Sequence, residues 1–64
     1  MQTGTKVYDY IYFKGEEGVI SSVNGDEIIV DFKTQKQVRY ISGGYYAEDN
    51  TQQKTLSQIG RAHV

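Results

Sequence analysis

The chain has 64 residues and no cysteine, with 7 Lys plus Arg against 8 Asp plus Glu. These values indicate one domain with a small core, and they exclude a disulfide framework and a thiolate metal site. The near-balanced charge argues against a general polyanion-binding protein. No run of about 18 apolar residues is present. The N-terminus also lacks the basic and then apolar pattern of a signal peptide, so we expect a cytoplasmic protein.

The first predicted element is a strand over Thr5–Phe13, because this stretch is rich in aromatic and β-branched residues. Its alternation permits two orientations. We favour the one in which Val7 and Ile11 face inward with Asp9 between them. The alternative places three tyrosines on one face: Tyr8, Tyr10 and Tyr12. A charged loop with two glycines, Lys14–Gly18, follows.

The centre of the chain, Gly18–Phe32, reads as one β-hairpin. Apolar residues alternate with polar ones on both arms, and Asn24 to Glu27 separates them. Asn-Gly is a strong turn signal, because a type I′ turn needs positive φ at both central residues. The sequence therefore predicts a tight type I′ hairpin.

Shorter elements follow the hairpin. Gln37–Ile41 alternates like a strand, Tyr45–Asn50 suits either a loop or a short helical turn, and Thr55–Ser57 could begin a closing strand. Short strands with glycine turns predict an all-β fold, a small antiparallel barrel of about five strands. The predicted core consists of Val19, Val23, Ile28, Val30, Phe32 and Val38.

The last six residues, Ile59–Val64, match a translation of a common sequencing-library adapter, Ile-Gly-Arg-Ala-His-Val followed by a stop codon. We therefore expect one domain over residues 1–58 and an adapter-derived tail over 59–64. On this interpretation the natural chain continues differently after about Ser57, and His63 takes no part in any mechanism.

Several segments together resemble SH3-like barrels found in small uncharacterised proteins of phages and gut bacteria. They are Lys6–Tyr10, Gly18–Ile20, Gly25–Asp26, Val30–Phe32, Tyr40, Gly43–Tyr45, Asp49 and Thr55–Ser57. The resemblance implies an SH3-like fold and a phage or mobile-element origin. It also implies that inhibition of a host defence system such as CRISPR is a function to consider.

Catalysis is not expected from these residues. The acidic pairs Glu16-Glu17 and Asp26-Glu27 fall in predicted turns, where carboxylates usually only interact with solvent. A catalytic nucleophile needs a positioned base, and a metal needs three or four convergent ligands. Neither pattern is present, so we predict a non-enzymatic protein without a metal or cofactor.

The aromatic residues favour a binding module. Six tyrosines and two phenylalanines exceed what so small a core can bury, and tyrosine is common at protein interfaces. We expect Tyr45 and Tyr46, which follow two glycines, to be the most exposed. The predicted surface for a protein partner or for self-association comprises Tyr10, Tyr12, Tyr45 and Tyr46.

The alternative hypothesis is a nucleic-acid-binding module. Lys33, Lys36 and Arg39 form a modest basic cluster with Tyr40 beside it. Cations with stacking aromatic rings are the groups that bind single-stranded nucleic acid. The excess of acidic over basic residues favours the protein partner.

Overall fold

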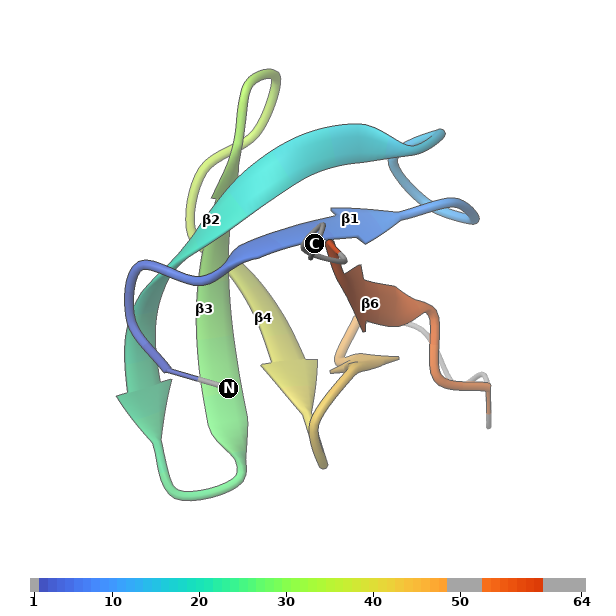
Figure 1. Ribbon diagram of the computed structural model, residues 1–64. Helices are drawn as coiled ribbons and strands as arrows, with labels where there is room; N and C mark the ends of the chain where they lie inside the picture. The colour runs from blue at the N-terminus through green and yellow to red at the C-terminus, as the bar shows by residue number, and fades with distance from the viewer. Residues whose placement is uncertain (1, 49–52, 60–64) are drawn as a thin grey trace, which may run out of the picture.

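The structure is a computed structural model that describes residues 2–48 and 53–59. No helix in these ranges is long and apolar enough to cross a membrane. The strands are β1 (Lys6–Asp9), β2 (Glu16–Asn24), β3 (Glu27–Phe32), β4 (Val38–Ile41), β5 (Tyr45–Tyr46) and β6 (Leu56–Gln58). They pair antiparallel in the order β5-β4-β3-β2-β1-β6 and curl into a nearly closed barrel (Figure 1). The predicted all-β class is confirmed, and the architecture is that of a small SH3-like barrel.

The predicted central hairpin is present, but it is longer and its turn differs. Its first arm starts at Glu16 rather than at Gly18. Asn24 pairs with Glu27, so the connection consists of Gly25 and Asp26 alone. Gly25 has φ of 63°, while Asp26 does not have positive φ. Positive φ at only the first central residue is the pattern of a type II′ turn, so the type I′ prediction is wrong.

A β-bulge divides β2 into two halves. Ile20 pairs with Val30 and Ser22 pairs with Ile29, so Ser21 is an extra residue on β2 with no residue of β3 directly opposite it. A bulge of this kind bends its strand and increases the local twist. In Figure 1, β2 is accordingly a long curved strand that runs beside both β1 and β3.

Two residues predicted for the core, Val19 and Val23, are not in it, and the bulge places them on opposite faces of the sheet. Before the bulge Ile20 faces the interior with 1% of its surface exposed, so its neighbour Val19 faces outward and is 38% exposed. After the bulge Val23 pairs with Ile28 but remains 41% exposed near the hairpin turn. The other four predictions are confirmed. The buried apolar core comprises Val7, Ile20, Ile28, Val30, Phe32, Val38, Tyr40 and Leu56.

The first strand is shorter than predicted. It ends at Asp9, and the chain then leaves the sheet as the β1–β2 loop, residues 10–15. Val7 is buried as expected, but Ile11 is 58% exposed, so its predicted inward orientation is wrong. The cause is local, because the Asp9 side chain accepts the Ile11 N–H at 2.9 Å and turns the backbone out of the sheet.

The barrel closes between β5 and the segment that leads into β6. The Gly44 carbonyl accepts the N–H groups of Thr55 at 3.0 Å and Leu56 at 3.1 Å. Tyr45 and Lys54 form a further antiparallel bridge. The short strand β5 thus replaces part of the predicted loop or helical turn, and residues 49 and 50 of that prediction lie outside the described residues.

The closing strand is confirmed close to its predicted position. β6 pairs with β1, and the Ile59 N–H donates to the Lys6 carbonyl at 3.0 Å. Sheet pairing therefore extends one residue into the predicted tail 59–64. Residues 60–64 lie outside the described residues.

Candidate functional site

The buried carboxylate of Asp9 forms hydrogen bonds with three parts of the barrel. It has no exposed surface. One carboxylate oxygen accepts the N–H groups of Ile11 at 2.9 Å and Tyr12 at 3.0 Å. The other accepts the hydroxyl protons of Tyr40 at 2.6 Å and Thr55 at 3.0 Å. These four hydrogen bonds join the β1–β2 loop to β4 and to the start of β6, and they replace the water that a buried carboxylate loses.

The same residue holds the loop through its backbone. The Asp9 carbonyl accepts the N–H of Gly15 at 2.9 Å and that of Phe13 at 3.3 Å. On the far side of the carboxylate, burial raises the pKa of the Tyr40 hydroxyl far above its ordinary value, and the hydrogen bond to Asp9 raises this pKa further. The Tyr40 hydroxyl therefore keeps its proton and donates a hydrogen bond to Asp9. Asp9 in turn holds the start of the β1–β2 loop in place.

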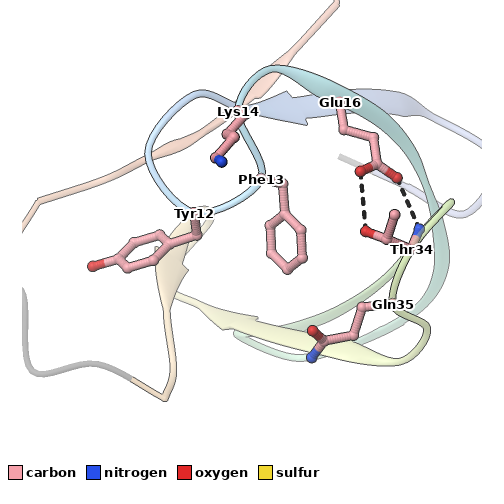
Figure 2. Close-up of a pocket in the computed structure, with 6 residues that line it drawn as sticks. All are labelled: Tyr12, Phe13, Lys14, Glu16, Thr34 and Gln35. Atoms are coloured by element: carbon pink, nitrogen blue, oxygen red, sulfur yellow. Dashed lines mark hydrogen bonds between the residues drawn. The ribbon is translucent and has the colours of Figure 1, made fainter.

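The loop between β3 and β4, residues 33–37, is held by two other carboxylates. Glu16 accepts the Thr34 N–H at 2.9 Å and the Thr34 hydroxyl at 3.1 Å, one with each carboxylate oxygen (Figure 2). Asp31 accepts the N–H of Gln37 at 2.9 Å. The sequence pattern places Glu16 in a solvated loop. In the structure, Glu16 is the first residue of β2, and its side chain links the end of the β1–β2 loop to the β3–β4 loop.

A pocket lies between these two loops. Figure 2 shows Phe13 projecting into it, with Thr34 and Gln35 on the opposite side. Its volume is about 530 Å³, and it is open to solvent. We call it the loop pocket, and it is lined by Tyr12, Phe13, Lys14, Glu16, Thr34 and Gln35.

Stacked rings support the aromatic side of the loop pocket. The Phe13 ring stacks on buried Phe32, with centroids 4.0 Å apart and planes at 10°. The Tyr12 ring stacks on Tyr46 at 4.2 Å and 27°. Tyr46 also meets Phe13 edge to face at 6.3 Å. The aromatic wall is thus continuous with the core, so its position is set by core packing.

The four predicted binding tyrosines do not form one surface. The structure brings Tyr12 and Tyr46 into contact, and Tyr12 lines the loop pocket. Tyr10 instead meets Tyr8 edge to face at 5.1 Å. It is 71% exposed, the most exposed large hydrophobic side chain among the described residues.

Tyr45 and Tyr46 point to opposite faces of β5. Tyr46 pairs with Tyr40 on the core side, whereas Tyr45 pairs with Ile41 on the outer side. Both tyrosines are half-buried. The expectation that they are the most exposed tyrosines is therefore wrong, because two glycines before a residue loosen the backbone without deciding what packs on it.

The predicted nucleic-acid cluster is also divided. Tyr40 is completely buried and hydrogen-bonded to Asp9, so its predicted role as a stacking platform is excluded by the fold. Arg39 forms an ion pair with Glu27. Lys33 and Lys36 remain exposed in the β3–β4 loop.

Sequence reasoning misses most of the loop pocket. The local pattern places Phe13 at the end of a strand, and Lys14 and Glu16 in a polar loop. No local pattern places Gln35 opposite Phe13, because the two belong to different loops. Asp9 carries a usable signal, since a carboxylate inside an aromatic and β-branched run demands hydrogen-bond partners if that run is buried.

Within the part of the chain that the structure describes, the site offers groups for contact and no cluster of metal-binding side chains. No buried side-chain nitrogen or oxygen among the described residues lacks a hydrogen bond. In the same part of the chain, no three His, Cys, Asp or Glu side chains gather where they could hold a metal ion. The loop pocket presents aromatic rings, the Gln35 amide and the Lys14 amine, which are groups that bind by packing, hydrogen bonding and charge.

Comparison with known protein families, characterised proteins and solved structures finds no match to this chain.

Proposed function

We propose that this protein is a non-catalytic binding module that contacts a partner protein through the loop pocket. The observation that carries the proposal is the continuous aromatic wall, Tyr12 and Phe13 supported by Tyr46 and Phe32, beside a concave opening. Concave sites lined by aromatic rings with a few polar groups are the usual form of a binding site.

Both loops that bound the loop pocket are fixed before any partner arrives. Asp9 holds the β1–β2 loop through its side chain and its carbonyl, and Glu16 joins this region to Thr34. A preformed site loses less conformational entropy on binding than a flexible one. This rigidity supports a recognition role for loops that are otherwise the most variable part of a small barrel.

The contacts favour protein over nucleic acid as the partner. Of the four residues in the alternative hypothesis, Tyr40 is buried and Arg39 is neutralised by Glu27. The remaining Lys33 and Lys36 would neutralise few phosphates, and the affinity for nucleic acid depends strongly on that number. The formal net charge of −1 adds to this preference.

A foreign partner fits the loop pocket better than a second copy of the chain. A symmetric dimer brings the same patch of both subunits together. Two concave openings placed face to face would leave a void between the two subunits. The occupant is therefore a protruding segment of a different protein.

A steric block provides the test. Gln35→Tyr fills the loop pocket but keeps the Gln35 carbonyl, which accepts the Phe32 N–H at 2.8 Å. Gln58→Tyr makes the same change at an exposed position on β6 and is the matched control. Each variant is immobilised, a bacterial lysate is passed over it with and without nuclease, and the captured proteins are identified by mass spectrometry.

We expect a protein that the wild type and Gln58→Tyr capture and that Gln35→Tyr does not, independently of nuclease. Equal capture by all three proteins would exclude the loop pocket. If nuclease abolished the capture, the protein would bind nucleic acid rather than a partner protein. Sedimentation over a range of concentrations would reveal self-association, which Gln35→Tyr should leave unchanged.

A further inference from the structure

Three lysines lie in the two loops that bound the loop pocket. Lys14 lines it, and Lys33 and Lys36 flank Thr34 and Gln35 in the loop on its other side. None of these three lysines forms an ion pair with a residue of the described ranges. By contrast, Lys6 and Arg39 on the outer face of the sheet are each paired with a glutamate.

Glu16 is the carboxylate in the lining, and its one negative charge offsets only one of these three cations. Both Glu16 oxygens already accept hydrogen bonds from Thr34, at 2.9 Å and 3.1 Å. The neighbouring Asp31 is engaged by the Gln37 N–H. The carboxylates near the opening therefore hold the loops, while the ammonium groups of the lysines remain available to a partner.

The backbone at Lys14 adds an independent observation. Lys14 has φ of 53° and the next residue, Gly15, has φ of 80°. Glycine or asparagine adopts this left-handed conformation more easily than lysine does. A lysine at this position therefore has no local conformational advantage. It does place a positive charge on the lining of the loop pocket.

We infer that the loop pocket binds an acidic peptide segment of the partner protein. An apolar side chain of the segment packs against Phe13, and carboxylates on either side of it reach Lys14 across one loop and Lys33 or Lys36 across the other. This inference rests on the proposed function and specifies the chemistry of its partner. Charge complementarity of this kind sets specificity and association rate.

The two other occupants fit less well. Single-stranded nucleic acid stacks its bases on open ring faces, and Tyr46 and Phe32 already cover one face each of Tyr12 and Phe13. A second copy of the chain would bring its own three lysines against these three. An acidic peptide needs only the edge of Phe13 and the surrounding ammonium groups.

Selection from a randomised displayed peptide library tests the chemistry of the loop pocket directly, because it does not require the natural partner. The intact chain is the bait, and the Gln35→Tyr variant is used to discard peptides that bind elsewhere. We expect the retained peptides to be enriched in Asp and Glu around an apolar residue. Their affinity should fall as salt concentration rises.

Lys14 offers a sharp set of variants. Lys14→Asn removes the charge but suits the left-handed backbone, so the fold should keep its melting temperature while affinity for the selected peptide falls by about fivefold. Lys14→Arg keeps the charge and should bind like the wild type. Ser42→Asn makes a matched change at φ of 52°, outside the loop pocket, and should leave binding unchanged.

The outcomes separate this inference from the function on which it rests. Retained peptides that are neutral or basic, or equal affinity of Lys14→Asn and the wild type, would overturn the acidic partner while leaving the loop pocket as the binding site. A library that yields no pocket-dependent peptide would count against both. If a labelled oligothymidylate bound more tightly than the selected peptides and its binding depended on Lys14, the ligand of the loop pocket would be single-stranded nucleic acid rather than an acidic peptide.

Discussion

Asp9 is the residue on which most of the loop geometry depends. Among the described residues, the four groups that donate to its side chain are uncharged, so hydrogen bonds stabilise the buried carboxylate there. Hydrogen bonds to a charged group contribute about 1.5–3 kcal/mol each, and a buried donor left without its acceptor costs about 1–3 kcal/mol. A small domain has a total stability of only about 3–5 kcal/mol. The Asp9 network is therefore comparable in size to the stability of the whole protein.

We predict that Asp9→Ala does not fold at 25 °C. The substitution leaves the buried Tyr40 hydroxyl and the Ile11 and Tyr12 N–H groups without their acceptor. Near-ultraviolet circular dichroism and urea titration would measure the loss of structure. Asp26→Ala, in the exposed hairpin turn, is the control and should change the free energy of unfolding by less than about 0.5 kcal/mol.

Asp9→Asn distinguishes hydrogen bonding from charge. Its amide oxygen can still accept the two backbone N–H groups, and its amide N–H groups can donate to the hydroxyls of Tyr40 and Thr55. We expect a folded protein that is less stable by about 1–3 kcal/mol. If Asp9→Ala instead unfolds at the wild-type urea concentration, the network has no role in stability.

At the scale of single elements, β2 is the strand that gives the barrel its shape. Its bulge at Ser21 changes which side chains face inward, and its Gly18 allows the opposite strand to pack closely. A Cβ atom at Gly18 would lie 2.8 Å from side-chain atoms of both Phe32 and Val30. Gly18 is therefore needed for space, since it does not have positive φ.

We predict that Gly18→Ala destabilises the protein by about 1–3 kcal/mol, because the added methyl group overpacks the core. Thermal and urea unfolding would measure the change. In the double variant with Val30→Ala, the smaller side chain should relieve part of the strain. The loss of unfolding free energy in the double variant should then be smaller than the sum of the losses in the two single variants. Strict additivity would show that crowding is not the cause. Ser22→Ala on the exposed side of the same strand is the control.

The hairpin of β2 and β3 shows where pattern reading succeeds and where it fails. Alternation places Ile28, Val30 and Phe32 of β3 correctly, since β3 is regular and its pairing is uninterrupted. On β2, Val19 and Ile20 are both apolar, so alternation alone permits either orientation. The prediction that Val19 and Val23 share one face is wrong because a bulge leaves no mark in the local sequence. It depends on how β2 pairs with its neighbour.

For the molecule as a whole, stability depends on closing the sheet across distant segments. The β6 strand adds to β1, and the Gly44 carbonyl binds Thr55 and Leu56. A Cβ atom at Gly44 would lie 3.0 Å from the Leu56 carbonyl oxygen, so the two segments meet at backbone distance. Contacts this far apart in sequence form only after costly loop closure.

We predict that removing residues 60–64 leaves the melting temperature within about 2–4 °C of the full chain. Ending the chain after Gln58 should lower it further, by about 4–8 °C, because the hydrogen bond from Ile59 to Lys6 contributes about 1 kcal/mol. Calorimetry of the three chains would measure both steps. Equal melting temperatures for all three would mean that Ile59 does not contribute, whereas a large loss on the first step would assign a structural role to the tail.

The sequence by itself determined the features that depend on neighbours along the chain. The Asn-Gly-Asp turn, the alternation in β3 and β4, and the glycines that end strands together predict an all-β barrel. Only the tertiary structure decided what depends on partners far along the chain. It buried Asp9 under Tyr40 and Thr55, took Tyr40 out of the predicted binding surface, and brought Phe13 opposite Gln35. The physical reason is that burial and hydrogen bonding are satisfied by groups in space, and periodicity describes only the backbone that carries them.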